Sequence, residues 1–264
     1  MNDLFSSPDF AWSIRMRRDA PEAFFAKHDS SGELLVQKQQ WLDQRPELCV
    51  ALSPEGERLV EETWALGRKW EQLEPQSETS VQEIARQWEA DWIYLDSTTF
   101  TLAGGCVCFP SSWNLQESTG KTLAQVHGVV PELEEQIGER INRFLRRLPE
   151  GQAFLRENWG LTRTKDLNYH PRLNRPRIEG PVSLEEVFLR IEHQAFLRLP
   201  SGILMGIRIE PVSVQQVVQQ APETARRLAG QLGTMPKAVA HYKGLEEANR
   251  WISGAIDEAL RNPA

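Results

Sequence analysis

Residues 187–209 read VFLRIEHQAFLRLPSGILMGIRI. Apolar side chains recur at every second position of this stretch, and that period is typical of a β-strand with two distinct faces. The turn-forming tripeptide Pro-Ser-Gly at residues 200–202 interrupts the alternation. A helical start at Ser183, with Glu186 three residues later, is an alternative for the first few residues, but the alternation is longer. We therefore predict two antiparallel strands joined as a hairpin.

Shorter alternating segments precede this hairpin, and helical patterns lie on both sides of the sheet region. Three short strands are predicted, joined by tight turns, at residues 92–95, 100–102 and 106–109. Elsewhere apolar residues recur with the helical period of about 3.6. This period predicts helices over residues 34–42, 54–70, 80–88, 131–147, 224–232, 236–242 and 245–260. The predicted fold class is α+β, with one antiparallel sheet flanked by helices.

The length of the chain favours one domain with helical additions over two separate domains. We therefore assign all 264 residues to a single domain. Within it, residues 1–90 are predicted to be mostly helical and residues 91–210 to contain the sheet. Residues 211–264 are predicted to form C-terminal helices.

The charge balance and the cysteine content exclude several classes of protein. The chain has 30 basic and 37 acidic residues and a net charge of −7, which argues against a nucleic-acid partner because such proteins carry a basic face. No apolar run is long enough for a membrane helix and no signal-peptide core follows the polar start, so no membrane association is expected. Three cysteines favour a reducing compartment and hence a cytoplasmic location. Dinucleotide-binding, phosphate-loop and hydrolase motifs do not occur.

A second informative stretch, residues 106–131, reads CVCFPSSWNLQESTGKTLAQVHGVVP. It contains the motifs C-F-P-S-x-W, G-K and V-H-x-x-V-P. Further motifs follow in order, namely R-x-N-W at residues 156–159, R-I-E-x-Q at residues 190–194 and Y-K-G at residues 242–244. Together these motifs resemble the heme-dependent oxidative N-demethylase family, formerly a domain of unknown function. The resemblance covers about residues 90–260.

The resemblance implies a fold, a cofactor and a reaction. The implied fold is a PAS-like antiparallel sheet with helices, and it holds heme b. The implied reaction is that of an oxidoreductase of the monooxygenase type: dioxygen activated at iron oxidises the N-methyl group of a small amine, and formaldehyde is released. Because the sequence shows no flavin or iron–sulfur site, the electrons are expected from a separate partner reductase.

Two departures from the family pattern keep other functions open. His193 stands where the family usually has arginine, and Ile209-Glu210 replaces a usual Thr-Tyr. These positions put the identity of the substrate amine in question more than the fold. One alternative is a non-catalytic heme-binding PAS-like sensor or binding module. The other is a heme-free helix-and-sheet domain that acts through protein contacts.

His127 is the candidate metal ligand. A neutral imidazole is a common axial ligand of heme iron, and the resemblance favours this role over that of a histidine that caps the local backbone. His193 is the main rival, but it lies on the apolar side of the predicted strand and is expected to be a core histidine. His170 lies in a loop and suits either a ligand or a surface residue.

Arg190, Glu192 and Arg208 occupy the polar sides of the paired strands, and the resemblance selects them as a group. The arginines are expected to bind heme propionates, because a guanidinium pairs well with a carboxylate. Glu192 is the candidate catalytic residue, which holds a substrate ammonium or relays protons. The alternative is a solvated sheet face with ion pairs.

Trp113 and Trp159 are candidates for the walls around a flat macrocycle, and core packing suits them equally well. Cys106 and Cys108 share one strand face. With the distant Cys49 they are too few for a structural zinc site or a four-thiolate cluster. We expect these thiols to pack in the core, and a thiolate ligand to iron is the alternative.

Overall fold

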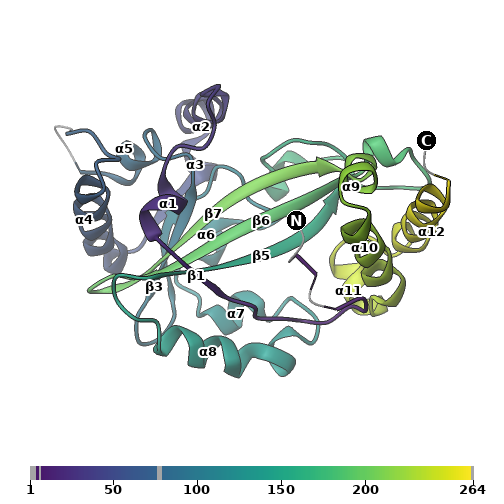
Figure 1. Ribbon diagram of the computed structural model, residues 1–264. Helices are drawn as coiled ribbons and strands as arrows, with labels where there is room; N and C mark the ends of the chain where they lie inside the picture. The colour runs from purple at the N-terminus through teal and green to yellow at the C-terminus, as the bar shows by residue number, and fades with distance from the viewer. Residues whose placement is uncertain (1–3, 6, 76–78, 263–264) are drawn as a thin grey trace.

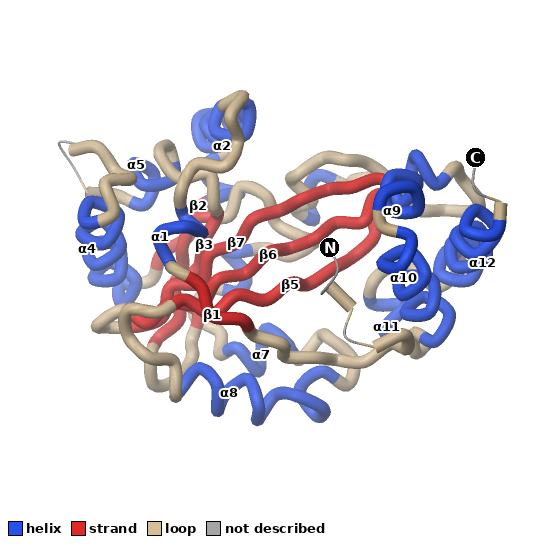
Figure 2. Tube along the Cα trace, in the orientation of Figure 1, coloured by secondary structure: helices blue, strands red, loops and turns tan. Residues whose placement is uncertain are grey.

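The computed structural model describes residues 4–5, 7–75 and 79–262, and its centre is one antiparallel sheet (Figure 1, Figure 2). The seven strands follow the order β1-β5-β6-β7-β3-β4-β2. Their bounds are β1 (Arg17–Asp19), β2 (Val50–Leu52), β3 (Asp91–Asp96), β4 (Leu102–Cys106), β5 (Ala153–Thr162), β6 (Phe188–Arg198) and β7 (Gly202–Ser213). Helices pack around this sheet, which confirms the α+β fold class.

The central hairpin of β6 and β7 agrees with the sequence prediction. The two strands pair along their whole length, with Ala195 opposite Gly206. The backbone N–H of Leu199 donates to the carbonyl of Gly202 at 2.9 Å and closes the turn. The helical alternative before the hairpin also exists, but only as a 3-10 turn over Leu184–Glu186 with a capping box.

The remaining strands differ from the prediction. Residues 92–109 form two strands rather than three, because the chain leaves the sheet after Cys106 and the N–H of Val107 donates to the carbonyl of Cys49 at 2.8 Å. The strand β5 was not predicted, because Arg156, Glu157 and Asn158 put polar side chains on both of its faces. Nor were β1 and β2, two edge strands of three residues each within the part expected to be mostly helical.

The helices form three groups along the chain (Figure 1). Before β3 come α1 (Pro21–Phe25), α2 (Glu33–Gln44), α3 (Pro46–Cys49), α4 (Pro54–Lys69) and α5 (Val81–Ala85). Between β4 and β5 come α6 (Leu115–Ser118), α7 (Leu123–His127) and α8 (Glu139–Arg146). After β7 come α9 (Val214–Gln220), α10 (Pro222–Thr234), α11 (Lys237–Tyr242) and α12 (Ala248–Arg261). Within the described residues, no helix has both the length and the apolar character needed to cross a membrane.

Local start signals explain two of the predicted helices of the first group, α4 and α5. α4 begins with Pro54 at its first position and has acidic residues in its first turn and basic residues in its last, an order that suits the helix dipole. α5 begins after Ser80, whose side chain accepts a hydrogen bond from the Glu83 N–H at 3.1 Å. Both starts agree with the sequence prediction.

The helix predicted from Pro131 begins later and irregularly. Glu132 has a φ of 62°, in the left-handed region that a helix does not use. A π-helical turn over Glu134–Gly138 follows, and α8 starts at Glu139. Such turns are rare and occur frequently at functional sites. This one lies between α7, which ends at His127, and α8.

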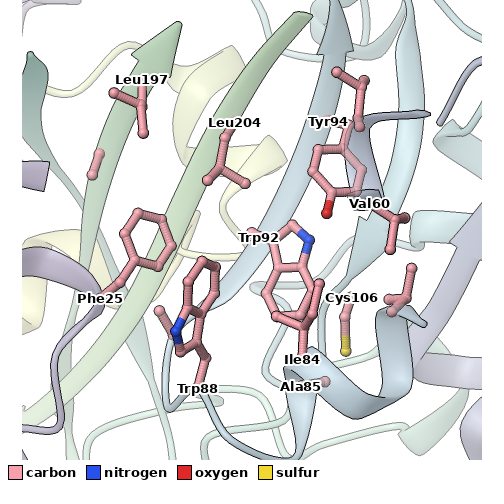
Figure 3. Packing of buried hydrophobic residues seen from close by; sticks show 14 of the residues in the cluster. Phe25, Val60, Ile84, Ala85, Trp88, Trp92, Tyr94, Cys106, Leu197 and Leu204 are labelled. Carbon is pink, nitrogen blue, oxygen red and sulfur yellow. The ribbon is translucent and has the colours of Figure 1, made fainter. Parts of the chain in front are cut away.

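The largest aromatic group of the core lies between the sheet and the helices α4 and α5 (Figure 3). The ring centroid of Trp88 lies 4.5 Å from that of Phe25 and 5.6 Å from that of Trp92. Cys106 is buried in the same cluster, as expected from the sequence. This cluster attaches the N-terminal helices to the sheet.

Two further hydrophobic clusters attach the other helices. The C-terminal helices α9 to α12 pack over the end of β6 that contains Leu189. On the opposite face, α8 packs on the sheet through Phe144, whose ring centroid lies 5.5 Å from Phe154 of β5 and 5.8 Å from Phe196 of β6. Between these clusters, the middle of the β5–β6 pair carries polar side chains.

Candidate functional site

One face of the β5–β6 pair carries the polar groups of the candidate site. Arg156 of β5 lies opposite Gln194 of β6, and Asn158 lies opposite Glu192. Because side chains alternate across a strand, these four residues project to the same face, while their immediate neighbours project to the other. The pairing of β5 with β6 therefore brings together a cation, a carboxylate and two amides.

His127 is the last residue of α7, and the positive charge of Arg156 on this face acts on its imidazole. A capping box between Thr122 and Gln125 starts the helix. The Nδ1 atom of His127 is buried and has no hydrogen-bond partner among the described residues. Burial, and then the positive charge of Arg156, lowers the pKa of His127 to about 4. The ring is therefore neutral at neutral pH, which is the form that binds a metal.

Arg156 is the second group of the site that lacks a partner. Its Nε–H is buried with no acceptor among the residues that the structure describes. Burial lowers the pKa of Arg156, although the nearby carboxylates of Glu192 and Glu157 act in the opposite direction. A guanidinium with a buried, unused Nε–H is a binding group for a carboxylate or another anion. The sequence motif R-x-N-W contains this residue, but without β5 its shared face with Glu192 was not apparent.

Glu192 is buried, and two neighbours hold its carboxylate. The hydroxyl of Ser111 donates to one oxygen at 3.0 Å, and the side-chain amide of Gln194 donates to the other. Ser111 belongs to the C-F-P-S motif, so this loop contacts the sheet at the candidate catalytic residue. The carboxylate is therefore oriented by the protein itself.

Arg190 lies on the same face, and each nitrogen of its guanidinium donates to the protein. It donates five hydrogen bonds, at 2.7–3.2 Å, to the Ser111 hydroxyl and to the carbonyls of Phe109, Pro110, Asp166 and Leu167. Arg190 thus attaches two loops to β6 and orients the Ser111 hydroxyl that reaches Glu192. In this structure it is a positioning residue whose three guanidinium nitrogens all donate to the protein.

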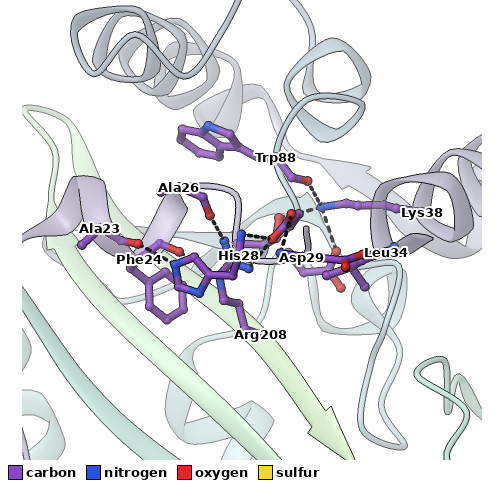
Figure 4. Close-up of polar contacts among 12 residues, drawn as sticks. Ala23, Phe24, Ala26, His28, Asp29, Leu34, Lys38, Trp88 and Arg208 are labelled. Carbon is purple, nitrogen blue, oxygen red and sulfur yellow. Dashed lines mark hydrogen bonds and ion pairs between the residues drawn. The ribbon is translucent and has the colours of Figure 1, made fainter. Parts of the chain in front are cut away.

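Arg208 lies on the face opposite to Arg190, which corrects the expectation that the two arginines act as a group. Its guanidinium donates to the carboxylate of Glu89 at 2.8 Å and to the carbonyls of Phe24 and Ala26 (Figure 4). These contacts attach α1 and the segment after it to β7. Arg208 is therefore a structural residue of the other face.

The two predicted wall residues, Trp113 and Trp159, do not lie together. The ring centroid of Trp159 lies 5.3 Å from that of Phe5, in the cluster under the C-terminal helices. Lys243 of the Y-K-G motif lies over the Trp159 ring and donates to its carbonyl at 2.9 Å. Trp113 packs in the separate cluster beside α8. The structure therefore gives both tryptophans a packing role and does not place them around one slot.

The two rival histidines differ from His127 in their surroundings. His193 is half-buried rather than in the core, with Nε2 3.1 Å from Glu210 and Nδ1 3.8 Å from Glu157. Hydrogen bonds with these carboxylates raise the pKa of His193 to about 9, so the ring is cationic at neutral pH and unsuited to a metal. His170 is buried in its loop, where Nδ1 accepts from the Arg172 N–H at 3.2 Å and Nε2 lacks a partner among the described residues.

A buried group of metal-ligating atoms lies away from this site, where Asp91, Cys106 and Cys108 have ligand atoms within 4.8 Å of one another. The Lys38 ammonium already lies there, 3.1 Å from Asp91, and donates to two backbone carbonyls at 2.6 and 3.0 Å (Figure 4). Burial raises the pKa of both thiols well above the ordinary value, so they are protonated. The geometry supports core packing for these thiols and not a thiolate ligand.

The arrangement around His127 defines the class of site. A neutral imidazole with a buried Nδ1 lies within the electrostatic influence of a guanidinium with an unused donor, and an oriented carboxylate lies on the same sheet face as the guanidinium. The imidazole can ligate a metal, and the guanidinium can bind an acidic group. These residues fit a metal centre carried by an acidic cofactor, as heme is.

Comparison with known protein families identifies the family of the chain. A family model described as haem-dependent oxidative N-demethylase, alpha subunit-like, matches residues 56–252. The chain therefore belongs to this heme-dependent family. The matched region contains His127, Arg156, Glu192 and Lys243. Among proteins with curated descriptions, none matches the chain.

Proposed function

We propose that the chain is the heme-binding part of an oxidoreductase that removes an N-methyl group from a small amine. Membership of the heme-dependent family supports the proposal. The observation that carries it is the neutral imidazole of His127, which lies near Arg156 and whose buried Nδ1 has no partner among the described residues. A buried polar atom without a partner costs about 1–3 kcal/mol. A bound cofactor would remove that cost.

In this proposal His127 ligates the iron of heme b, and Arg156 binds a propionate. Bound heme would supply the activation of dioxygen, which side chains alone do not provide. The overall reaction consumes the N-methyl amine, dioxygen, two electrons and two protons, and releases the demethylated amine, formaldehyde and water. The methyl carbon is oxidised to a carbinolamine, and its C–N bond then breaks.

Glu192 is the residue that we assign to the substrate. In a buried site, little water screens the attraction between a carboxylate and a substrate ammonium. Ser111 and Gln194 orient both oxygens before the substrate arrives, so binding requires no reorientation of the carboxylate. When the C–N bond breaks, the departing nitrogen takes a proton, and Glu192 holds or relays that proton.

The proposal includes the setting in which the chain works. Because its sequence contains no flavin or iron–sulfur motif, the two electrons come from a separate partner reductase. The three cysteines are free and buried in the structure, which fits the reducing cytoplasm that we propose as its location. The proposal also includes a single-domain organisation and a PAS-like sheet that holds the heme.

Absorption spectra of protein from heme-supplemented cells test the cofactor assignment. The wild-type protein is expected to show a Soret band, and His127→Ala to lose it or to change its shape. His193→Ala, on the opposite face, is the matched control and should keep the wild-type spectrum. An unchanged oxidised and reduced spectrum for His127→Ala would remove this residue from the role. Formaldehyde release from dimethylamine, with a surrogate electron donor, tests the reaction.

A second function, a heme-binding sensor without turnover, is favoured by one position. Ile209 lies opposite Glu192 on the same face, where the resemblance to the family leads us to expect threonine. The apolar side chain gives β7 no hydroxyl at this position, so Ser111 is the hydroxyl that contacts the candidate catalytic carboxylate. A protein that binds heme but releases no formaldehyde from any small methylamine would support this second function.

A further inference from the structure

The surface of α8 is basic, although the chain as a whole has a net charge of −7. Four arginines on and directly after this helix are exposed: Arg140, Arg143, Arg146 and Arg147. Among the residues that the structure describes, Arg143 alone of these four forms an ion pair, with the exposed Glu139 at 3.1 Å. Such exposed pairs contribute little. The helix therefore presents several positive charges that the protein leaves unneutralised.

These arginines border a groove with an apolar floor. The groove has a volume of about 430 Å³ and is lined by Ile14, Met16, Phe144, Pro149, Phe154 and the arginines 140, 143 and 147. Ile14 and Met16 of the N-terminal segment line one side and residues on and after α8 line the other. Figure 1 shows the N-terminal segment running past α8. Arginine, phenylalanine and methionine are enriched at the centres of protein interfaces. We call this feature the arginine groove.

The arginine groove lies close to the candidate heme site. Phe154 of its floor and Arg156 of the site are alternate residues on one face of β5, so they are about 7 Å apart. On the other side, α8 follows α7 and His127 through the π-helical turn. A protein bound in the groove would therefore lie next to the proposed cofactor.

We propose that the arginine groove docks an acidic electron-transfer protein with an iron–sulfur cluster. This inference rests on the proposed function, because the reaction needs electrons that the chain does not supply. One electron passes from the reduced cluster to ferric heme iron, so the cluster is oxidised and the iron becomes ferrous. Two such transfers supply one turnover. Nucleic acid is long enough to contact the acidic remainder of the chain as well, which repels it. A compact acidic protein can contact the basic groove alone.

The test uses a purified plant-type [2Fe–2S] ferredoxin, a compact acidic protein, as the probe. The groove variant combines Arg140→Glu, Arg143→Glu and Arg147→Glu. The matched control combines Arg226→Glu, Arg250→Glu and Arg261→Glu on the exposed surface of the C-terminal helices. We expect calorimetry at low salt to show at least tenfold weaker ferredoxin binding for the groove variant and unchanged binding for the control. Wild-type binding should weaken as salt is added.

Heme reduction provides a second measurement. Ferredoxin should reduce the heme of the groove variant at least tenfold more slowly than that of the wild type, whereas dithionite should reduce both equally. Equal ferredoxin binding by the wild type and the groove variant overturns the proposal. So does tighter, groove-dependent binding of phosphatidylserine vesicles or of DNA.

The binding test separates this inference from the proposed function. If no form of the protein takes up heme, groove-dependent binding of ferredoxin to the heme-free chain still supports the docking surface, and the proposed function fails. If the protein binds heme and releases formaldehyde with a surrogate donor, but the groove variant binds ferredoxin as tightly as the wild type, only the docking proposal is wrong. Equal circular dichroism and melting temperatures show that the variants are folded.

Discussion

At the scale of single residues, His127 of α7 and His193 of β6 are in opposite charge states. Burial and Arg156 lower the pKa of His127 to about 4, and two carboxylates raise the pKa of His193 to about 9. Neighbouring charge and burial decide both directions. The two residues therefore make opposite contributions to the pH dependence of stability.

His127 should make the heme-free protein less stable as the pH falls. In the unfolded chain the histidine is protonated below about pH 6.5, whereas in the folded site it is protonated only below about pH 4. The free energy of unfolding therefore falls as the pH falls through this window. The loss amounts to up to about 3 kcal/mol. Urea unfolding at pH 7 and pH 4.5 should show a smaller loss for His127→Gln than for the wild type. An equal loss in both proteins would contradict the assigned pKa.

His193 should stabilise the protein at low and neutral pH only. Its folded pKa is raised, so its contribution is complete below pH 6.5 and is lost as the pH rises through about 9. Because the residue is partly exposed, we expect His193→Gln to cost about 1 kcal/mol at pH 6. The difference from the wild type should vanish at pH 10, and a difference that persists there would exclude the ion-pair explanation.

At the scale of elements, one side chain of β6 joins two loops to the sheet. Arg190 donates to the carbonyls of Phe109 and Pro110 in one loop and of Asp166 and Leu167 in the other. The planar guanidinium directs five donors at fixed angles, whereas an ammonium has three. This geometry explains why an arginine is required at this point of the strand.

Replacing Arg190 should therefore destabilise the fold and disturb Glu192. We expect Arg190→Ala to cost at least about 3 kcal/mol in urea unfolding, because several buried carbonyls lose their donors. Arg190→Lys should recover less than half of that loss. Full recovery by lysine would show that charge alone matters. Arg198→Lys, in the same strand, is a control with fewer buried partners.

The strand β4 depends on glycine for a different reason. A Cβ on Gly105, which has a φ of 142°, would lie 2.2 Å from the carbonyl oxygen of Trp92 in the neighbouring strand. Gly105→Ala should therefore lower the melting temperature sharply, by more than 10 °C, which corresponds to at least about 3 kcal/mol. Gly254→Ala in α12 meets no atom within 4 Å and should be about 0.5–1 kcal/mol more stable. A tolerated Gly105→Ala would contradict the strand pairing described here.

At the scale of the whole molecule, the sequence predicted the parts with a strong local signal. The hairpin of β6 and β7 follows from strict alternation around a Pro-Ser-Gly turn, and the long helices follow from their period and start signals. β5 was missed because Arg156, Glu157 and Asn158 put polar groups on both of its faces, which removes the alternation that marks a half-buried strand. β1 and β2 are too short for a period to be visible.

The candidate site was predictable only in part, because it depends on pairing between distant strands. His127 and Glu192 were selected by their motifs, but Arg156 required the register of β5 against β6. The separation of Arg208 from Arg190 could have been found in the sequence. The tight turn pairs Arg198 with Ile203, and counting outward places Arg208 opposite His193, on the other face.

The adjacency of Arg156 and Glu157 in β5 has a consequence for how this chain would respond to changes of length. The two residues have opposite charges and project to opposite faces. A slip of one position in the ladder would exchange them and put an anion near His127, which favours a protonated ring that cannot ligate a metal. We therefore expect insertions before β5 to preserve the site only if the loop absorbs them or if they shift the strand by an even number of residues. A shift by an odd number would reverse the charge that faces His127.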